Sequence, residues 1–106
     1  MTNEIQTTLT ALADPGRRRA IELLAQRPMR AGELAAHAGT SRPSAGRHLR
    51  ELTERGLVEP ADGDRQGTVY QVRAERFVAL NAWLTELFAY WRGQLDGPGS
   101  APPPGA

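Results

Sequence analysis

Residues 41–58 read SRPSAGRHLRELTERGLV, and this stretch decides the fold. Ser41 is a good N-cap for a helix with Pro43 in its first turn, and Gly56 is a good residue to end it. The apolar positions recur at the spacing of one helical face and are Ala45, Leu49 and Leu52. The arginines fall on the other side. This pattern predicts an amphipathic helix whose outer face is basic.

The residues before this helix predict three more helices. The apolar positions of the first, which spans about ten residues, are Ile5, Leu9 and Leu12. Asp14 and Pro15 then form a cap and a first turn that start a second helix, which Pro28 ends; its inward positions are Ala20, Ile21, Leu24 and Ala25. A third helix covers residues 31–38 and ends at Gly39. Arg30 occupies the position of the usual capping Ser, Thr or Asp, so we expect the start of this helix to fray.

The residues after residue 56 predict a hairpin and a long helix. Two short strand patterns cover residues 58–61 and 68–72, and the residues between them have turn chemistry throughout. A helical pattern then runs from residue 75 to about residue 95. Residues 97–106 hold four prolines and three glycines and predict a disordered tail. The fold class is therefore mainly α with a small β-hairpin wing, a single winged helix-turn-helix domain over residues 1–96.

Composition excludes several classes of protein. The chain has 106 residues, enough for one modest core, with 40% hydrophobic and 24% charged residues. Its apolar runs are far shorter than the roughly 20 residues of a membrane span, and its start does not resemble a secretory signal, so we expect a cytoplasmic protein with no membrane partner. The absence of cysteine excludes disulfides, thiolate nucleophiles and iron–sulfur clusters. The sequence has no nucleophile elbow, phosphate loop or paired catalytic carboxylates, so we expect no enzymatic activity.

Positive charge is concentrated in the middle of the chain. All 13 basic residues are arginine, whose planar guanidinium suits phosphate and guanine, although the formal net charge is only +1. Residues 17–73 hold 11 arginines against seven acidic residues, a local balance of +4. Helix-turn-helix proteins place their second helix in the DNA major groove, so this distribution favours a DNA-binding surface over a three-helix domain whose arginines only solvate one face.

The same residues resemble the ArsR (arsenical-resistance repressor) family of bacterial regulators. The resemblance extends over about residues 5–95. The stretches that carry it are residues 11–24, residues 32–35 and, most specifically, the block from Ser41 to Val58. It implies a homodimer that represses transcription and releases DNA when a signal arrives. Many members sense metals through cysteine pairs or through histidine and carboxylate ligands on the last helix. This chain has no cysteine, and its two histidines, His37 and His48, both lie in the helix-turn-helix, so we expect no metal and no cofactor.

The predicted DNA-binding residues lie on the second helix of the motif and on the wing. The candidates for base edges are Arg42, Ser44 and Arg47, and the candidates for the DNA backbone are Ser41, Arg50, Arg65, Gln66 and Thr68. His48 either touches a phosphate or packs against a neighbouring helix. Gly46 belongs to the same surface, but it stands where the family usually has serine. Arg17 and Arg18 are weaker candidates for phosphate contacts.

Five of the six aromatic residues crowd the last helix, more apolar surface than one small domain can bury. We therefore expect a homodimer through the first and last helices, and a palindromic DNA operator to match it. The predicted interface residues are Ile5, Leu9, Leu12, Leu80, Trp83, Leu84, Leu87 and Trp91. A pocket for an apolar small-molecule effector among Trp83, Leu87 and Trp91 is a further hypothesis. The rival function from another class is a winged-helix module that binds an acidic protein partner and no specific DNA.

Overall fold

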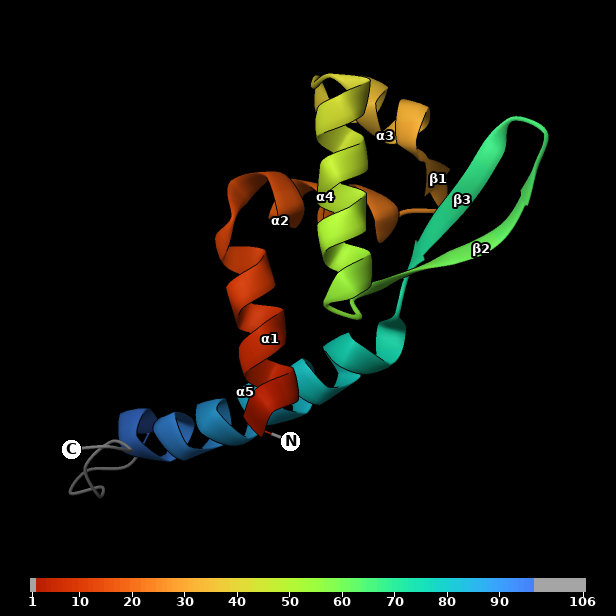
Figure 1. The fold of residues 1–106 in the computed structure, drawn as a ribbon. Coiled ribbons are helices and arrows are strands. Elements are labelled where there is room, and N and C mark those ends of the chain that lie inside the picture. Colours follow the sequence, from red (N-terminus) through yellow and green to blue (C-terminus); the bar gives the residue numbers. More distant parts are fainter. Residues whose placement is uncertain (1, 97–106) are drawn as a thin grey trace.

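The computed structural model describes residues 2–96, which form five helices and a three-stranded antiparallel sheet (Figure 1). The helices that pack against the sheet are α2, α3 and α4. The helices are α1 (Thr2–Ala13), α2 (Pro15–Leu24), α3 (Ala31–Ala38), α4 (Arg42–Glu54) and α5 (Ala74–Asp96). The strands are β1 (Met29–Arg30), β2 (Val58–Asp64) and β3 (Gly67–Val72). The predicted winged helix-turn-helix, mainly α with a small wing, is confirmed. The predicted tail at residues 97–106 lies outside the described residues.

The predicted capping residues start and end the helices of the motif. The Asp14 carboxylate accepts a hydrogen bond from the Arg17 backbone N–H at 2.9 Å and so starts α2. Ser41 starts α4 in the same way, since its hydroxyl oxygen accepts from the Ser44 N–H at 3.2 Å. Gly39 ends α3 with a φ of 67°, in the left-handed region that glycine adopts without strain. Local sequence chemistry therefore determines where these helices begin and end.

The start of α3 does not depend on a capping side chain at Arg30. The Glu33 carboxylate, three residues on, accepts a hydrogen bond from the Arg30 backbone N–H at 2.9 Å. This is the reciprocal half of a capping box, and it satisfies one of the N–H groups that a helix start leaves unpaired. The prediction of fraying rested on the residue at the cap alone, and the glutamate at the third helical position supplies this hydrogen bond.

The wing is larger than predicted. β2 continues to Asp64, so the turn narrows to Arg65 and Gln66, and the hairpin extends well away from the helices (Figure 1). The two-residue strand β1, which the sequence did not predict, adds a third strand in the order β1-β3-β2. Arg30 lies opposite Val69 in this pairing. β1 therefore joins the start of α3 directly to the wing.

The core lies between α2, α3, α4 and the sheet. Its largest fully buried apolar side chains are Met29, Leu34, Leu49, Leu52, Leu57 and Val58. The predicted inward face of α2 holds at Ala20, Ile21 and Leu24, but Ala25 is exposed beyond the helix end and Leu23 is buried instead. The core thus holds α4 rigidly by one face and leaves its arginine-bearing face outside.

α5 crosses α1 and then extends away from the rest of the domain (Figure 1). Its inner end is in the core, where Leu80 is only 9% exposed, so Leu80 is a core residue in the single chain. Leu12 also packs partly against the core, while Ile5 and Leu87 are half-buried. The exposed large apolar residues are Leu9, Val78, Trp83, Leu84, Phe88, Tyr90, Trp91 and Leu95. All but one belong to α5, so most of this helix has an apolar surface that one copy of the chain does not cover.

Candidate nucleic-acid interface

The outer face of α4 carries three exposed arginines, Arg42, Arg47 and Arg50. At about 100° per residue they fall within an arc of about 140°. Arg47 and Arg50 lie on the side of the helix away from its buried stripe, and Arg42 lies next to the stripe. Arg42 lies at the edge of this arc, where its guanidinium passes over Gly32 at the start of α3. The buried stripe fixes the rotation of the helix, so the direction of these arginines follows from the packing of the core.

The arginines divide into two groups. Eight of the 13 donate a hydrogen bond or form an ion pair within the protein, and these are Arg17, Arg18, Arg19, Arg27, Arg30, Arg55, Arg73 and Arg76. Arg42, Arg47, Arg50, Arg65 and Arg92 have no such partner among residues 2–96. Four of these five are on the outer face of α4 and at the tip of the wing, so the charge available to an external anion is concentrated there.

Arg17 and Arg18, the weaker candidates for phosphate contacts, both donate hydrogen bonds within the protein. The Arg17 side chain is 13% exposed; its Nε donates to the Ala11 carbonyl at 3.0 Å, and its guanidinium lies 3.6 Å from Glu51 of α4. The Arg18 guanidinium donates to the Leu12 carbonyl at 2.8 Å. Both side chains thus satisfy carbonyl groups at the end of α1, where a helix leaves acceptors unpaired.

His48 packs inside the domain. Its side chain is 14% exposed, and a β-carbon added at Gly16 would clash with its Nε2 atom. Nδ1 lies 3.6 Å from the Glu51 carboxylate and 3.9 Å from that of Asp14. Of the two roles left open by the sequence, the structure favours packing, because the imidazole fills the space between α4 and the start of α2.

The other predicted residues of α4 have different surroundings. Ser41 is exposed, and its hydroxyl oxygen already serves as the cap of the helix. Ser44 and Gly46 are half-buried, and a β-carbon at Gly46 would have no atom within 4 Å. A side chain therefore fits at Gly46, and packing does not require glycine at this position.

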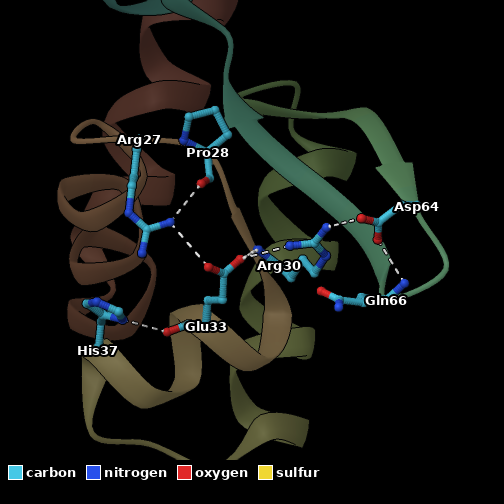
Figure 2. Close-up of polar contacts among 7 residues, drawn as sticks. All are labelled: Arg27, Pro28, Arg30, Glu33, His37, Asp64 and Gln66. Carbon is cyan, nitrogen blue, oxygen red and sulfur yellow. Dashed lines mark hydrogen bonds and ion pairs between the residues drawn. The ribbon is translucent and has the colours of Figure 1, made fainter.

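The wing tip presents Arg65, Gln66 and Thr68, all exposed. Asp64 shapes the turn, since its Oδ1 atom accepts a hydrogen bond from the Gln66 backbone N–H at 2.8 Å. Its other oxygen lies 2.9 Å from Nη2 of Arg30 (Figure 2). Asp64 was not among the predicted functional residues, although an Asp at the first position of a turn is a common turn-forming pattern.

Three carboxylates accept hydrogen bonds from backbone N–H groups, and we call Asp14, Glu33 and Asp64 the capping carboxylates. The Arg17 backbone N–H is the main cause that lowers the pKa of Asp14 below its ordinary value. The Arg30 N–H, followed by the Arg27 side chain, lowers the pKa of Glu33. The Gln66 N–H, followed by Arg30, lowers the pKa of Asp64. All three groups favour the ionised form in the folded protein.

Other classes of site have less support among the described residues. Between residues 2 and 96, no three His, Cys, Asp or Glu side chains come together in a group that could hold a metal ion. Within that range, no helix is long and apolar enough to cross a membrane. An apolar groove of about 770 Å³ lies between α2, β3 and the first half of α5, lined by residues that include Ile21, Leu24, Phe77 and Val78. The predicted effector residues Trp83, Leu87 and Trp91 do not line this groove.

Known proteins with similar sequences and structures are transcriptional regulators. Residues 14–60 match the model of the family described as bacterial regulatory protein, arsR family. The chain is 39% identical over 88 residues to the HTH-type transcriptional regulator Rv2034 of Mycobacterium tuberculosis, covering 82% of this chain and 78% of that protein.

Two solved structures share the fold. An ArsR-like transcriptional regulator from Rhodococcus sp. RHA1 superposes with a TM-score of 0.72 at 26% identity, over 88% of this chain and 87% of that one. The homodimeric winged helix-turn-helix DNA-binding domain of Mb0332 from Mycobacterium bovis gives a TM-score of 0.65 at 24% identity, over 83% and 81%. The free arginines of α4 and the wing therefore lie on elements that are arranged as in known regulators.

Proposed function

The chain belongs to the ArsR family of bacterial regulatory proteins, and from this premise we propose that it binds an inverted-repeat DNA operator as a homodimer and represses transcription there. It is a DNA-binding transcriptional regulator with a winged helix-turn-helix fold. The proposal adds the oligomeric state, the contact residues, the form of the operator and the sign of regulation.

The observation that carries the proposal is the distribution of unpaired arginines. An arginine that the protein does not use can give all its donors to a phosphate or to a guanine. The fold commits eight arginines to internal contacts and leaves Arg42, Arg47, Arg50 and Arg65 on one pair of elements, α4 and the wing. In winged helix-turn-helix proteins these are the elements that meet the major groove and the neighbouring backbone.

Within this surface we assign contacts by position. Arg42, Ser44 and Arg47 lie in the first half of α4, the part of a recognition helix that reaches base edges. Arg47 is the best candidate for guanine because its side chain is exposed and makes no hydrogen bond or ion pair with any residue between 2 and 96. The DNA backbone is contacted by Arg50 and by the wing residues Arg65, Gln66 and Thr68. The main chain around Ser41 adds a further contact to a DNA phosphate.

The homodimer covers the apolar surface of α5. Trp83, Leu84, Phe88 and Trp91 are between 39% and 60% exposed in one chain, and Leu9 of α1 is 43% exposed. A second copy that packs α1 and α5 against the same helices would remove this surface from water. The similar Mycobacterium bovis domain is a homodimer, which supports the same assembly here. A two-fold dimer presents two copies of α4 to DNA, hence an operator with two-fold symmetry.

We propose further that metal binding does not control this regulator. The chain has no cysteine, and its two histidines, His37 and His48, lie on different helices of the motif, one exposed and one packed against α2. Zinc and softer metals are held by three or four ligands, mostly imidazole or thiolate with some carboxylate, and residues 2–96 hold no such group of His, Asp and Glu. The signal therefore acts through other chemistry, and the apolar effector among Trp83, Leu87 and Trp91 remains a prediction.

The experiment that tests the function is selection from random duplex DNA with the purified protein at near-physiological salt. We expect an enriched inverted repeat, and an affinity that falls steeply as salt concentration rises. A folded dimer that enriches no sequence would support the rival function, a winged-helix module for an acidic protein partner. A reporter gene placed under the enriched sequence then shows whether binding lowers transcription, as proposed.

The dimer has its own test. Leu84→Glu places a charge on the apolar surface of α5 and should give a monomer by light scattering, with an unchanged helical signal by circular dichroism. Thr85→Glu is the matched control, since Thr85 is also exposed and its replacement adds the same charge one residue away. A Leu84→Glu protein that stays dimeric would place the interface elsewhere.

A further inference from the structure

A chain of four alternating charges connects the start of the helix-turn-helix to the wing tip (Figure 2). The Arg27 guanidinium lies 3.2 Å from one oxygen of Glu33, and the Arg30 guanidinium lies 3.6 Å from the other. Arg30 then reaches across to Asp64, with 2.9 Å between its Nη2 atom and the carboxylate. Asp64 and Arg30 are 34 residues apart in the sequence, so only the fold brings them together.

Backbone pairing does not hold the tip of the wing by itself. β1 pairs with β3 at Arg30 and Val69, which fixes the base of the hairpin. The pairing of β2 with β3 is irregular between Ala61 and Asp64 and resumes only at Asp64 and Gly67, and the tip is exposed. A hairpin with a break in its ladder can bend there, so the position of the tip depends on other contacts.

The Arg30–Asp64 pair supplies such a contact at the position where it is needed. Asp64 uses one oxygen to shape the turn through the Gln66 N–H and the other to bind Arg30. The Arg30 side chain is only 26% exposed, and Glu33 holds it from the other side. The backbone of Arg30 therefore belongs to the start of the helix-turn-helix, and its guanidinium holds the turn that carries Arg65 and Gln66.

We propose that Arg30 and Asp64 form a clamp that positions the wing tip against DNA, so that Asp64, an acidic residue, increases affinity for DNA. This inference rests on the proposed function, because it concerns how the wing meets the DNA backbone. An unpaired carboxylate next to Arg65 would repel phosphate. The paired carboxylate instead holds Arg65 and Gln66 in a fixed orientation relative to α4, so fewer conformations are lost on binding. Arg30 and Asp64 are thus positioning residues.

The test is to remove the negative charge of Asp64 and measure affinity for the selected operator. Asp64→Asn keeps an oxygen that can accept from the Gln66 N–H, so it removes the charged pair and preserves the turn. We expect binding to weaken by about threefold to tenfold, which lies within the range that two partly exposed ion pairs, one in each protomer of the dimer, can contribute. Asp62→Asn is the matched control, because Asp62 is exposed on the same hairpin and its side chain has no partner among the described residues. That control should bind DNA equally well or more tightly, since it removes a repelling charge.

Two further variants separate the clamp from a direct contact of Arg30 with phosphate. In a clamp, Arg30→Gln combined with Asp64→Asn weakens binding no more than Arg30→Gln alone, because each change already breaks the same pair. If Arg30 instead contacted a phosphate directly, Asp64→Asn would change the affinity for DNA as much in the Arg30→Gln protein as in the unmodified protein, or would increase it. Asp64→Asn that binds as tightly as Asp62→Asn would overturn the proposal.

A measurement without DNA keeps the clamp testable if the proposed function fails. Amide hydrogen exchange at residues 65–67 should be faster in Arg30→Gln than in the unmodified protein, while exchange in α4 stays unchanged. Equal exchange at the tip would refute the clamp whatever the DNA result. A protein with a slowly exchanging tip that enriches no DNA sequence would refute the proposed function and leave the clamp standing.

Discussion

Replacement of Arg47 by alanine is the sharpest test of the α4 surface. Arg47 is exposed on the side of α4 opposite its buried stripe, and its side chain makes no hydrogen bond or ion pair with any residue between 2 and 96. The change therefore breaks no internal contact, and the free energy of unfolding should move by less than about 0.5 kcal/mol. Any loss of DNA affinity then comes from the lost contact with DNA.

The expected loss follows from the two copies of α4 in a dimer. One arginine that contacts a guanine contributes about 1–3 kcal/mol, so two copies lose at least about 2 kcal/mol. We expect at least a tenfold weaker affinity for the selected operator, measured by fluorescence anisotropy over a range of salt concentrations. If Arg47 contacts a base, discrimination between operator variants also falls; if it contacts a phosphate, the salt slope falls by about one per copy.

Arg92→Ala is the matched control for this experiment. Arg92 is also exposed and unpaired in the described part of the chain, but it lies on α5, beyond the helix-turn-helix. The two variants change the net charge equally, so long-range electrostatics would weaken DNA binding in both. An Arg47→Ala protein that keeps full affinity, or that loses no more than Arg92→Ala, would refute the assignment of Arg47 as a DNA contact.

Three more predictions concern stability. Arg17→Ala should lower the free energy of unfolding by about 2 kcal/mol, since it removes a charged donor from carbonyls at the end of α1. Thermal denaturation should show a fall in Tm of about 10 °C. The control is Arg19→Ala, which should lower the free energy of unfolding by less than about 0.5 kcal/mol because the Arg19 side chain is 53% exposed. Gly46→Ala should raise the free energy of unfolding by about 0.5–1 kcal/mol, because a helical glycine is replaced where a β-carbon meets no atom within 4 Å; a lower urea midpoint would contradict this. Because the capping carboxylates have lowered pKa values in the folded protein, the unfolded chain binds more protons than the folded protein in acid. Their contribution to the free energy of unfolding is therefore complete above the ordinary pKa values of 3.8 for Asp and 4.5 for Glu. It is lost as pH falls through the lower pKa values of the folded protein. Urea midpoints from pH 6 to pH 3 test this, and Asp14→Asn should flatten the fall.

The sequence alone was sufficient for the elements of the motif. The caps at Asp14 and Ser41 and the glycine at Gly39 act through hydrogen bonds and backbone angles within a few residues, so a short window of sequence contains their whole cause. The apolar spacing of α4 likewise predicted which face is buried, because helical periodicity is a local property. The wing turn was predicted as well, although its strands were predicted too short.

Tertiary structure decided which charges are free and which are used. Arg17 and Arg47 have the same side chain, yet one satisfies carbonyls of α1 and the other has no internal partner. Sequence spacing cannot separate them, since the acceptors of Arg17 depend on how α1 packs on α2. The same applies to Arg30 and Asp64, which meet only because a two-residue strand joins the sheet. Local hydrogen bonds and periodicity thus determined the elements, and long-range packing determined the surface that they present to DNA.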